Sequence, residues 1–355
     1  MKIIDLLQNK NRGKDNFFKR PYIIAEAGVN HEGNIDTAIK LIKLASDGGA
    51  DAIKFQTYKA EKLASKNSPS YWDLNSESTT TQYKLFKKYD NFWKKDYELL
   101  HTHCQKNNIE FISTPFDEES ASFLNDLMPV FKISSSDINN KIFINYICEF
   151  SKPIILSTGA SNMPEIRQAV TWIKKYNIKL ALLHCILNYP TKDINANLGM
   201  ILDIKDEFEN LIIGYSDHTL PKDMSTIVYS TLLGAEIIEK HFTHDKNLAG
   251  NDHYHSMDIN DLINLRKKLD EIVSIVGSLK KHSISSEKLS RTNARRSLVA
   301  SKIIKKGERF SYKNITYKRP GIGVSPSNVE KVIGKIALFD INKDDILMPI
   351  MIKDY

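Results

Sequence analysis

Residues Leu211 to Thr219 read Leu-Ile-Ile-Gly-Tyr-Ser-Asp-His-Thr, an apolar run that becomes polar at its carboxyl end. Such a run is typical of a buried strand that delivers polar side chains at its last residues. A second run, Ala235 to Thr243, has the same form: it reads Ala-Glu-Ile-Ile-Glu-Lys-His-Phe-Thr and contains His241. If these two strands are neighbours in a sheet, His218 and His241 face one cavity.

Two histidines at adjoining strand ends are a common way to hold a catalytic metal ion. Two neutral ring nitrogens fix the ion, and open positions remain for water and substrate. The alternative is that each imidazole is only hydrogen-bonded within its loop, which is the commoner role of a single histidine at a strand end. The matching contexts of the pair favour the metal, so we predict that His218 and His241 are ligands of a divalent ion.

The rest of the chain, from Pro21 onward, alternates short apolar runs with amphipathic stretches, which is typical of a parallel sheet covered by helices. The predicted strands are residues 22–26, 52–57, 110–114, 130–135, 153–158, 180–185, 211–216 and 237–241. The clearest predicted helices are residues 35–47, 86–107, 164–176 and 220–233. Eight strand and helix units in about 250 residues predict a (β/α)₈ TIM barrel, whose active site lies at the carboxyl ends of the strands.

A second, smaller domain is predicted at the carboxyl end of the chain. Residues 283–295 are polar without apolar periodicity, which favours a linker, and residues 296–355 form short β-rich runs punctuated by Gly and Pro. We therefore predict a barrel over residues 1–282 and a small β-rich domain over residues 296–355.

Composition excludes several classes of protein. The chain has 355 residues, 41% hydrophobic and 26% charged, and no apolar run approaches the roughly 20 residues that a membrane span requires. The net charge of +7 comes from lysines spread along the chain, without a basic run interleaved with aromatics, so a nucleic-acid partner is not expected.

Residues 1–20 lack the pattern of a secretory signal, which predicts a cytoplasmic protein, and the three cysteines are expected to be reduced thiols.

Polar residues end nearly every predicted strand. They are Glu26, Lys54, Gln56, Thr114, Lys132, Ser134, Ser135, Ser157, Thr158, His184, Asn188 and Tyr189. Any one hydroxyl among them could merely cap a helix or satisfy a loop. Lys54 and Lys132 are more informative, because a lysine inside an apolar strand must reach solvent or meet an anion. Together with the hydroxyls they predict a seat for a phosphate or a carboxylate.

Eight short motifs follow one another along the chain. They are Ile24-Ala25-Glu26-Ala27-Gly28-Val29-Asn30-His31-Glu32-Gly33, Lys54-Phe55-Gln56-Thr57, Ser113-Thr114-Pro115-Phe116, Lys132-Ile133-Ser134-Ser135, Leu156-Ser157-Thr158-Gly159, Ser216-Asp217-His218-Thr219, Glu239-Lys240-His241-Phe242 and Lys318-Arg319-Pro320-Gly321. In this order they resemble the sialic acid synthase family, and the resemblance extends from Pro21 to the end of the chain. The carboxyl-terminal part is similar to the antifreeze-like, or SAF, domain of these synthases.

The resemblance implies an activity and a set of roles. The family condenses phosphoenolpyruvate with an N-acylated amino-sugar aldehyde to give a nonulosonic acid, with a divalent ion that is typically Mn²⁺ and alternatively Mg²⁺ or Co²⁺. It implies that His218 and His241 bind the metal. Phosphoenolpyruvate would be held by Lys54, Thr114, Lys132, Ser135 and Ser157; the sugar by Gln56, Tyr189, Ser216, Asp252 and Arg319; and Glu26, Asp137, Lys54 and Lys132 would be catalytic. Family members form domain-swapped homodimers, in which the SAF domain covers the barrel mouth of the partner and brings Arg319 to the N-acyl group.

Three features depart from the family pattern. Asp137 stands where members carry Glu, Asn188 stands directly beside Tyr189, and two further histidines, His253 and His255, follow Asp252. The two histidines could be sugar donors, loop residues that face solvent, or further metal ligands. Their presence favours an acceptor other than N-acetylmannosamine.

We therefore predict a metal-dependent nonulosonic acid synthase. One alternative is another phosphoenolpyruvate-condensing aldolase of this barrel class that acts on a different aldose. A phosphorylated aldose should require an additional basic cluster at the mouth. The other is a non-catalytic sugar-binding homologue, which the retention of the histidines, Glu26 and both strand lysines disfavours.

Overall fold

The computed structural model describes residues 1–8, 20–72, 74, 77–250, 252–278 and 280–355, so Asn251, next to the predicted sugar ligand Asp252, lies outside the described residues. The chain forms two compact units, Met1–Leu279 and Lys280–Tyr355. Each unit has its own hydrophobic core.

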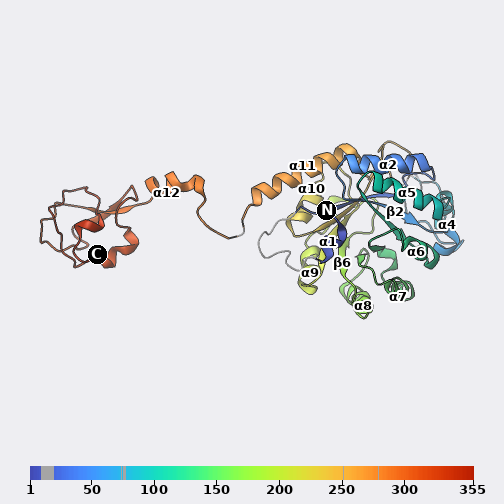
Figure 1. Ribbon diagram of the computed structural model, residues 1–355, viewed down its shortest axis with the longest axis horizontal. Coiled ribbons are helices and arrows are strands. Elements are labelled where there is room, and N and C mark those ends of the chain that lie inside the picture. Colours follow the sequence, from blue (N-terminus) through green and yellow to red (C-terminus); the bar gives the residue numbers. More distant parts are fainter. Residues whose placement is uncertain (9–19, 73, 75–76, 251, 279) are drawn as a thin grey trace. The chain divides into compact units, whose positions relative to one another are not determined.

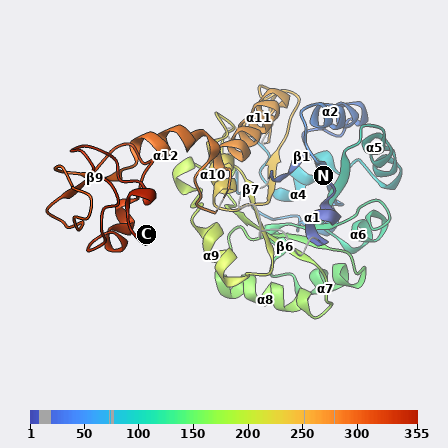
Figure 2. The same cartoon turned by 60° about the vertical axis from the view of Figure 1, so that its left-hand side comes forward.

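The first unit is a TIM barrel (Figures 1 and 2). Its strands in the described chain are β1 (Tyr22–Gly28), β2 (Ala52–Thr57), β3 (Glu110–Pro115), β4 (Phe131–Ile133), β5 (Ile154–Ser157), β6 (Leu180–Cys185), β7 (Ile212–Asp217) and β8 (Ile237–His241). All pairings are parallel in the order β3-β2-β1-β8-β7-β6-β5-β4, and β3 and β4, at the two ends of this order, also pack side by side. The predicted fold class is confirmed.

Helices surround the barrel. They are α2 (Ile35–Asp47), α3 (Ala60–Leu63), α4 (Gln82–Tyr89), α5 (Lys94–Lys106), α6 (Glu118–Leu124), α7 (Lys141–Glu149), α8 (Met163–Lys174), α9 (Met200–Glu207), α10 (Ser225–Leu232) and α11 (Ile259–Val276). Within the described residues, none of the helices combines the length and apolar character needed to span a bilayer.

The prediction of one helix over residues 86–107 is wrong, because the structure has two helices there. The segment between α4 and α5 is held by bonds that a continuous helix could not make. Asp90 accepts hydrogen bonds from the Ala60 backbone at 3.1 Å and, through its carbonyl, from Lys59 Nζ at 2.8 Å. Trp93 then starts α5, where its backbone N–H donates to Asp96 Oδ2 at 2.9 Å. These tertiary bonds fold an insertion back over the barrel mouth.

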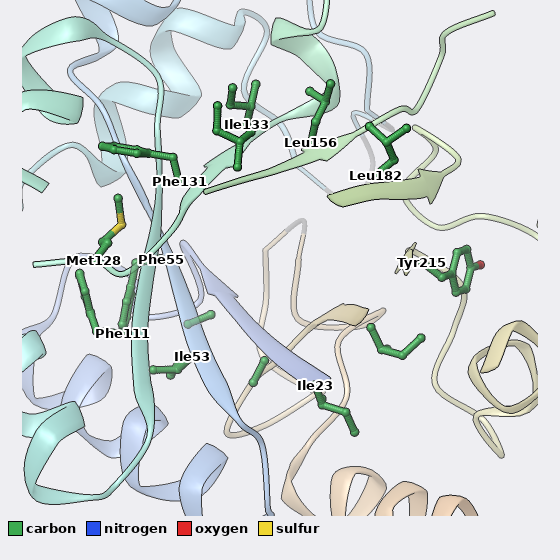
Figure 3. Packing of buried hydrophobic residues seen from close by; sticks show 14 of the residues in the cluster. Ile23, Ile53, Phe55, Phe111, Met128, Phe131, Ile133, Leu156, Leu182 and Tyr215 are labelled. Carbon is green, nitrogen blue, oxygen red and sulfur yellow. The ribbon is translucent and has the colours of Figure 1, made fainter. Parts of the chain in front are cut away.

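Side chains alternate along each strand between two cores. The outward-facing residues, among them Ile23, Ile53, Phe111 and Leu182, pack under the helices (Figure 3). The strands are buried on both faces, which explains why their sequences are almost continuously apolar.

A helix closes the amino-terminal end of the barrel interior. The inward-facing residues Tyr22, Ile24, Ala52, Ile112, Val130, Ile155, Ala181, Leu183 and Ile237 form a core with Ile3, Leu6 and Leu7 of α1 (Ile3–Gln8). No element is predicted there from the sequence, because six residues are too few to show helical periodicity. With this end filled by side chains, the polar groups of the interior gather at the opposite, carboxyl end.

The second unit is small and β-rich. Strands β9 (Ser297–Ala300) and β10 (Ile315–Lys318) pair antiparallel and pack on a core that includes Phe310 and Leu347. The stretch predicted as a linker contains a 3₁₀ turn, Ser285–Glu287, and helix α12 (Lys288–Ala294), whose residues are all exposed.

His31 gives the fold a specific pH dependence. Its buried ring stacks on Phe92 with centroids 4.4 Å apart, and Nδ1 accepts the Gly33 N–H at 3.1 Å. Burial lowers the pKa of His31 to about 4, although a backbone bond with Gly28 opposes the shift. At pH values between the ordinary pKa near 6.5 and this value, His31 binds a proton in the unfolded chain but not in the folded chain. The free energy of unfolding must therefore fall as pH falls through this window.

We predict that this histidine alone accounts for about 2 to 3 kcal/mol of stability lost between pH 7.5 and 4.5. Urea unfolding of the wild type and of His31→Gln at both pH values measures the difference. The variant should lose less stability on acidification than the wild type, and equal losses would contradict the assignment.

Candidate active site

Strand register brings polar residues from distant parts of the sequence into one layer. Glu26 of β1 pairs with Lys54 of β2 on one side and with His241 of β8 on the other, and Glu239 of β8 pairs with Ser216 of β7. Side chains two apart on a strand point to the same face. Glu239 and His241 therefore both face the barrel interior, near its carboxyl end.

The first part of the layer is a buried lysine and carboxylate cluster. Lys54 Nζ lies 2.6 Å from Glu26 Oε2 and donates to Thr114 Oγ1 at 2.8 Å. Gln56 Nε2 donates to the other oxygen of Glu26 at 2.9 Å. Lys54, Glu26 and Thr114 are buried. The structure thus joins four of the predicted site residues in one hydrogen-bonded group.

Lys132 of β4 lies on the far side of the same cluster. Its Nζ donates to Ser157 Oγ at 2.8 Å and to the Ile133 carbonyl at 3.2 Å. Glu239 Oε1 is 3.8 Å from Lys132 Nζ and also 3.8 Å from Lys54 Nζ, so one carboxylate faces both ammonium groups. Ser216 Oγ donates to the same oxygen of Glu239 at 3.3 Å.

Glu239 was missed as a site residue by the sequence analysis. It is buried within an apolar strand, and like the two strand lysines it is a charged side chain that needs a partner there. That signal was obscured because Glu236 and Lys240 lie close to it in the sequence.

The charges in this cluster are unevenly matched. Burial lowers the pKa of Lys54, but Glu239 and Glu26 outweigh burial and raise it overall. Burial also lowers the pKa of Lys132, and here Glu239 does not restore it. Burial raises the pKa of Glu26 against the opposing charge of Lys54. Lys132 is thus the cation whose charge is least compensated, and an anion bound beside it would supply the missing partner.

Two further predicted residues lie near the ends of β4 and β5. Ser135 is buried, and its Oγ accepts the Gly159 N–H at 2.9 Å. Asp137 accepts a hydrogen bond from Asn140 at 3.1 Å, and burial raises the pKa of its carboxyl. Among the described residues, the bonds of Asp137 do not join it to the lysine cluster, and its catalytic role stays a prediction.

The second part of the layer is a group of imidazoles. The rings of His218 and His241 are 5.5 Å apart at an angle of 60°. His218 Nδ1 lies 2.8 Å from the Ile186 carbonyl, which only a protonated Nδ1 can bond, so in the neutral ring Nε2 carries the lone pair. Burial lowers the pKa of His218, but the neighbouring Cys185 outweighs burial and raises it overall, so a metal would have to displace a proton from this ring. Tyr189 packs against both rings, with centroids 4.2 Å from His218 and 5.8 Å from His241.

The ring of His241 is placed as a metal ligand would be. Within the described chain its buried Nδ1 makes no hydrogen bond, and Asp252 Oδ2 lies 3.5 Å away. Burial, followed by the charges of His255 and His218, lowers the pKa of His241 well below its ordinary value, so the ring is neutral. A neutral imidazole with an unused buried nitrogen is the form that binds a metal.

The loop after β8 adds more donors. One ligand atom each from His241, Asp252 and His255 lies within 4.8 Å of the others. This mixed nitrogen and oxygen set fits a divalent first-row ion. His253 points elsewhere: its Nδ1 bonds Thr243 Oγ1 at 2.8 Å, and its Nε2 is 3.4 Å from Glu32. Both loop histidines are buried, so the interpretation that they face solvent is wrong.

A buried ion pair lies beside the histidines. Lys240 Nζ is 2.7 Å from Asp217 Oδ2 and also donates to the Thr219 carbonyl at 2.7 Å. Because Asp217 precedes His218 and Lys240 precedes His241, the pair ties together the two strand ends that carry the imidazoles.

A cavity that opens to solvent lies beside His241 and Asp252. Its wall is largely aromatic and comes in part from the insertion between β2 and α5. The lining residues include Asn30, Glu32, Gln56, Tyr58, Tyr71, Trp72, Phe86, Tyr89, Tyr189 and His253. As far as the described residues go, the lining contains neither Lys nor Arg. The predicted sugar ligands Gln56, Tyr189 and Asp252 share this wall, whereas Arg319 is an exposed residue of the carboxyl-terminal unit.

A barrel that concentrates buried lysines, carboxylates and imidazoles at the carboxyl ends of its strands has the architecture of a TIM-barrel enzyme. Comparison with known proteins gives the family. The model of the NeuB family matches residues 41–281, and the SAF domain model matches residues 295–353. The chain belongs to the NeuB family.

Relatives agree with this assignment. The chain is 40% identical to the N,N'-diacetyllegionaminic acid synthase of Campylobacter jejuni, over 93% of this chain and 99% of that protein. It is 34% identical to a pseudaminic acid synthase of the same organism, over 94% and 97% of the two chains. The crystal structure of an N-acetylneuraminic acid synthetase from Leptospira borgpetersenii, in complex with citrate, matches with a TM-score of 0.69 and 36% identity, over 77% of this chain and 90% of that one. The chain is therefore an enzyme of the synthase class that forms carbon–carbon bonds by condensation.

Proposed function

We propose that this enzyme condenses phosphoenolpyruvate with an N-acylated hexosamine aldehyde and water, giving a nonulosonic acid and inorganic phosphate. The observation that carries the proposal is the uneven charge of the buried cluster. Within the part of the chain that the structure describes, Lys132 donates only to a hydroxyl and a carbonyl. The carboxylate of Glu239 is 3.8 Å away and is shared with Lys54. A small dianion such as an enol phosphate would complete this arrangement.

The proposed reaction needs three changes in bonding. C3 of the enol attacks the aldehyde carbon and forms the new carbon–carbon bond, while the aldehyde oxygen takes a proton. Water adds to C2, which has become electron-poor, and loses a proton. The tetrahedral adduct then expels phosphate by cleavage of the bond between C2 and the bridging oxygen, while the C2 hydroxyl loses its proton and becomes the keto group.

The protein's groups suit these changes. Lys132 and Lys54 would hold the phosphate and carboxylate and stabilise the charge that grows on the leaving phosphate, with hydroxyls of Thr114, Ser135 and Ser157 nearby. Glu26 has a raised pKa and bonds to Lys54 and Gln56, so we assign proton transfer near the aldehyde to it. A divalent ion on His218 and His241, which we propose is Mn²⁺, would polarise the aldehyde oxygen.

The acceptor is proposed to lie in the aromatic cavity. Because the described lining carries no cation, an acceptor without phosphate fits better than a phosphorylated aldose. The aromatic wall favours apolar acyl and deoxy groups over a fully hydroxylated sugar. Together with the 40% identity to a diacetyllegionaminic acid synthase, this supports a di-N-acylated hexosamine as the acceptor.

The assembly proposed for catalysis is a domain-swapped homodimer in a cytoplasmic location, where phosphoenolpyruvate is available. The match of residues 295–353 to the SAF domain supports the first part. In such a dimer, exposed Arg319 of one chain would contact the N-acyl group bound by the other.

Phosphate release tests the proposal directly. We predict that the Mn²⁺-loaded enzyme releases phosphate from phosphoenolpyruvate only when a suitable hexosamine is present, with the largest rate for di-N-acylated, unphosphorylated sugars. Mass spectrometry should detect the condensed acid in amounts equal to the phosphate. His241→Ala and chelation of the metal should each abolish release. The absence of release across a panel of acylated hexosamines would refute the proposal.

The proposed binding of phosphate by Lys132 has its own test. Replacing Lys132 by Met removes a charged donor worth about 1.5 to 3 kcal/mol, so the KM for phosphoenolpyruvate should rise roughly 10- to 100-fold. The KM for the sugar should change little. Lys175→Met, at an exposed site, is the matched control and should leave both constants unchanged. Thermal unfolding checks that the barrel is intact. An unaltered KM for phosphoenolpyruvate in a folded Lys132→Met enzyme would show that the phosphate does not bind beside Lys132.

A further inference from the structure

His255 lies against the predicted metal ligands although it is far from His218 in the sequence. Its side chain is fully buried. The centroid of its ring is 4.9 Å from that of His241 and 5.7 Å from that of Tyr189. Tyr189 also contacts His218, so one aromatic ring is surrounded by three imidazoles.

The backbone of the loop fixes this position. The Met257 N–H donates to the His241 carbonyl at 2.8 Å, so the loop returns to the end of the strand that it left. Ser256 Oγ donates to the Asp252 carbonyl and accepts from Asn30 Nδ2 at 3.0 Å. His255 is therefore held between two anchored residues, beside the imidazole of His241.

The neighbouring histidine of the loop is a natural contrast. His253 is also buried, but its ring nitrogens face Thr243 and Glu32. Only His255 of the two contributes to the cluster with His241 and Asp252.

We infer that His255 is a further protein ligand of the divalent ion, in one group with His241 and Asp252 and beside His218, whose ring centroid is 5.5 Å from that of His241. The ligand atoms of His241, Asp252 and His255 lie within 4.8 Å of one another. Ligands bonded at about 2.1 Å to one ion are separated by at most about 4.2 Å, so only a small closure is needed. The inference deepens the proposed function, because it concerns the ion of that same site, but it is tested with metal alone.

The ligand set has a consequence for metal choice. Three imidazole nitrogens and one carboxylate suit Mn²⁺, Co²⁺ or Zn²⁺, whereas Mg²⁺ prefers oxygen ligands and retains its waters. A third imidazole should therefore increase the preference of the site for these ions over Mg²⁺.

The test is Mn²⁺ binding to the full-length, metal-free protein without substrates, followed by the electron paramagnetic resonance signal of free Mn²⁺. We expect His255→Ala to weaken Mn²⁺ binding at least about tenfold and to reduce the preference for Mn²⁺ over Mg²⁺. His253→Ala is the matched control and should stay within about twofold of the wild type. Pulsed resonance of bound Mn²⁺ should detect one coupled histidine nitrogen fewer in His255→Ala.

A second variant, His255→Gln, keeps most of the volume, and circular dichroism of both metal-free variants checks the fold. Wild-type Mn²⁺ affinity and an unchanged number of coupled nitrogens in His255→Ala would overturn the inference, even if phosphate release were lost. If instead Mn²⁺ binding weakens as expected while the wild type releases no phosphate with any sugar, the metal assignment stands and the proposed function fails.

Discussion

The carboxylate of Glu239 is the group on which the site depends. Two ammonium groups, Lys54 and Lys132, are buried inside a barrel, and desolvating each costs several kcal/mol unless an anion lies nearby. An oxygen of Glu239 lies 3.8 Å from Nζ of each lysine, and Glu26 Oε2 lies 2.6 Å from Lys54 Nζ. This arrangement favours the charged form of Lys54 and leaves Lys132, whose pKa is lowered by burial, without a close carboxylate of its own.

The same strand connects this cluster to the proposed metal site. Glu239 and His241 are two residues apart on β8, so both face the interior, the first beside the lysines and the second beside Asp252. A substrate with an anionic end and a reacting carbon could therefore contact the lysines while its partner aldehyde lies near the imidazoles. The amino-terminal end of the interior is filled by α1 and its apolar neighbours, which leaves the carboxyl end as the place for polar chemistry.

The barrel and many of its site residues were predictable from the sequence, because apolar runs identify the strands and the polar residues within them. Lys54, Lys132 and His241 interrupt apolar runs, and a charged or polar side chain in such a run needs a partner. What sequence could not supply were features set by tertiary contacts. The break between α4 and α5 depends on Asp90 bonding to Lys59 and Ala60, and the position of His255 depends on Met257 bonding back to His241. Glu239 escaped notice because neighbouring charges made it look like part of a solvated stretch.

A crystal structure of the enzyme with Mn²⁺ and phosphoenolpyruvate would test the account most directly. The account predicts an anomalous manganese peak coordinated by His218 and His241. It also predicts phosphate oxygens about 3 Å from Lys132 Nζ, with Glu239 still between the two lysines. A phosphate bound away from Lys132, or manganese bound elsewhere while His218 and His241 remain unliganded, would contradict it.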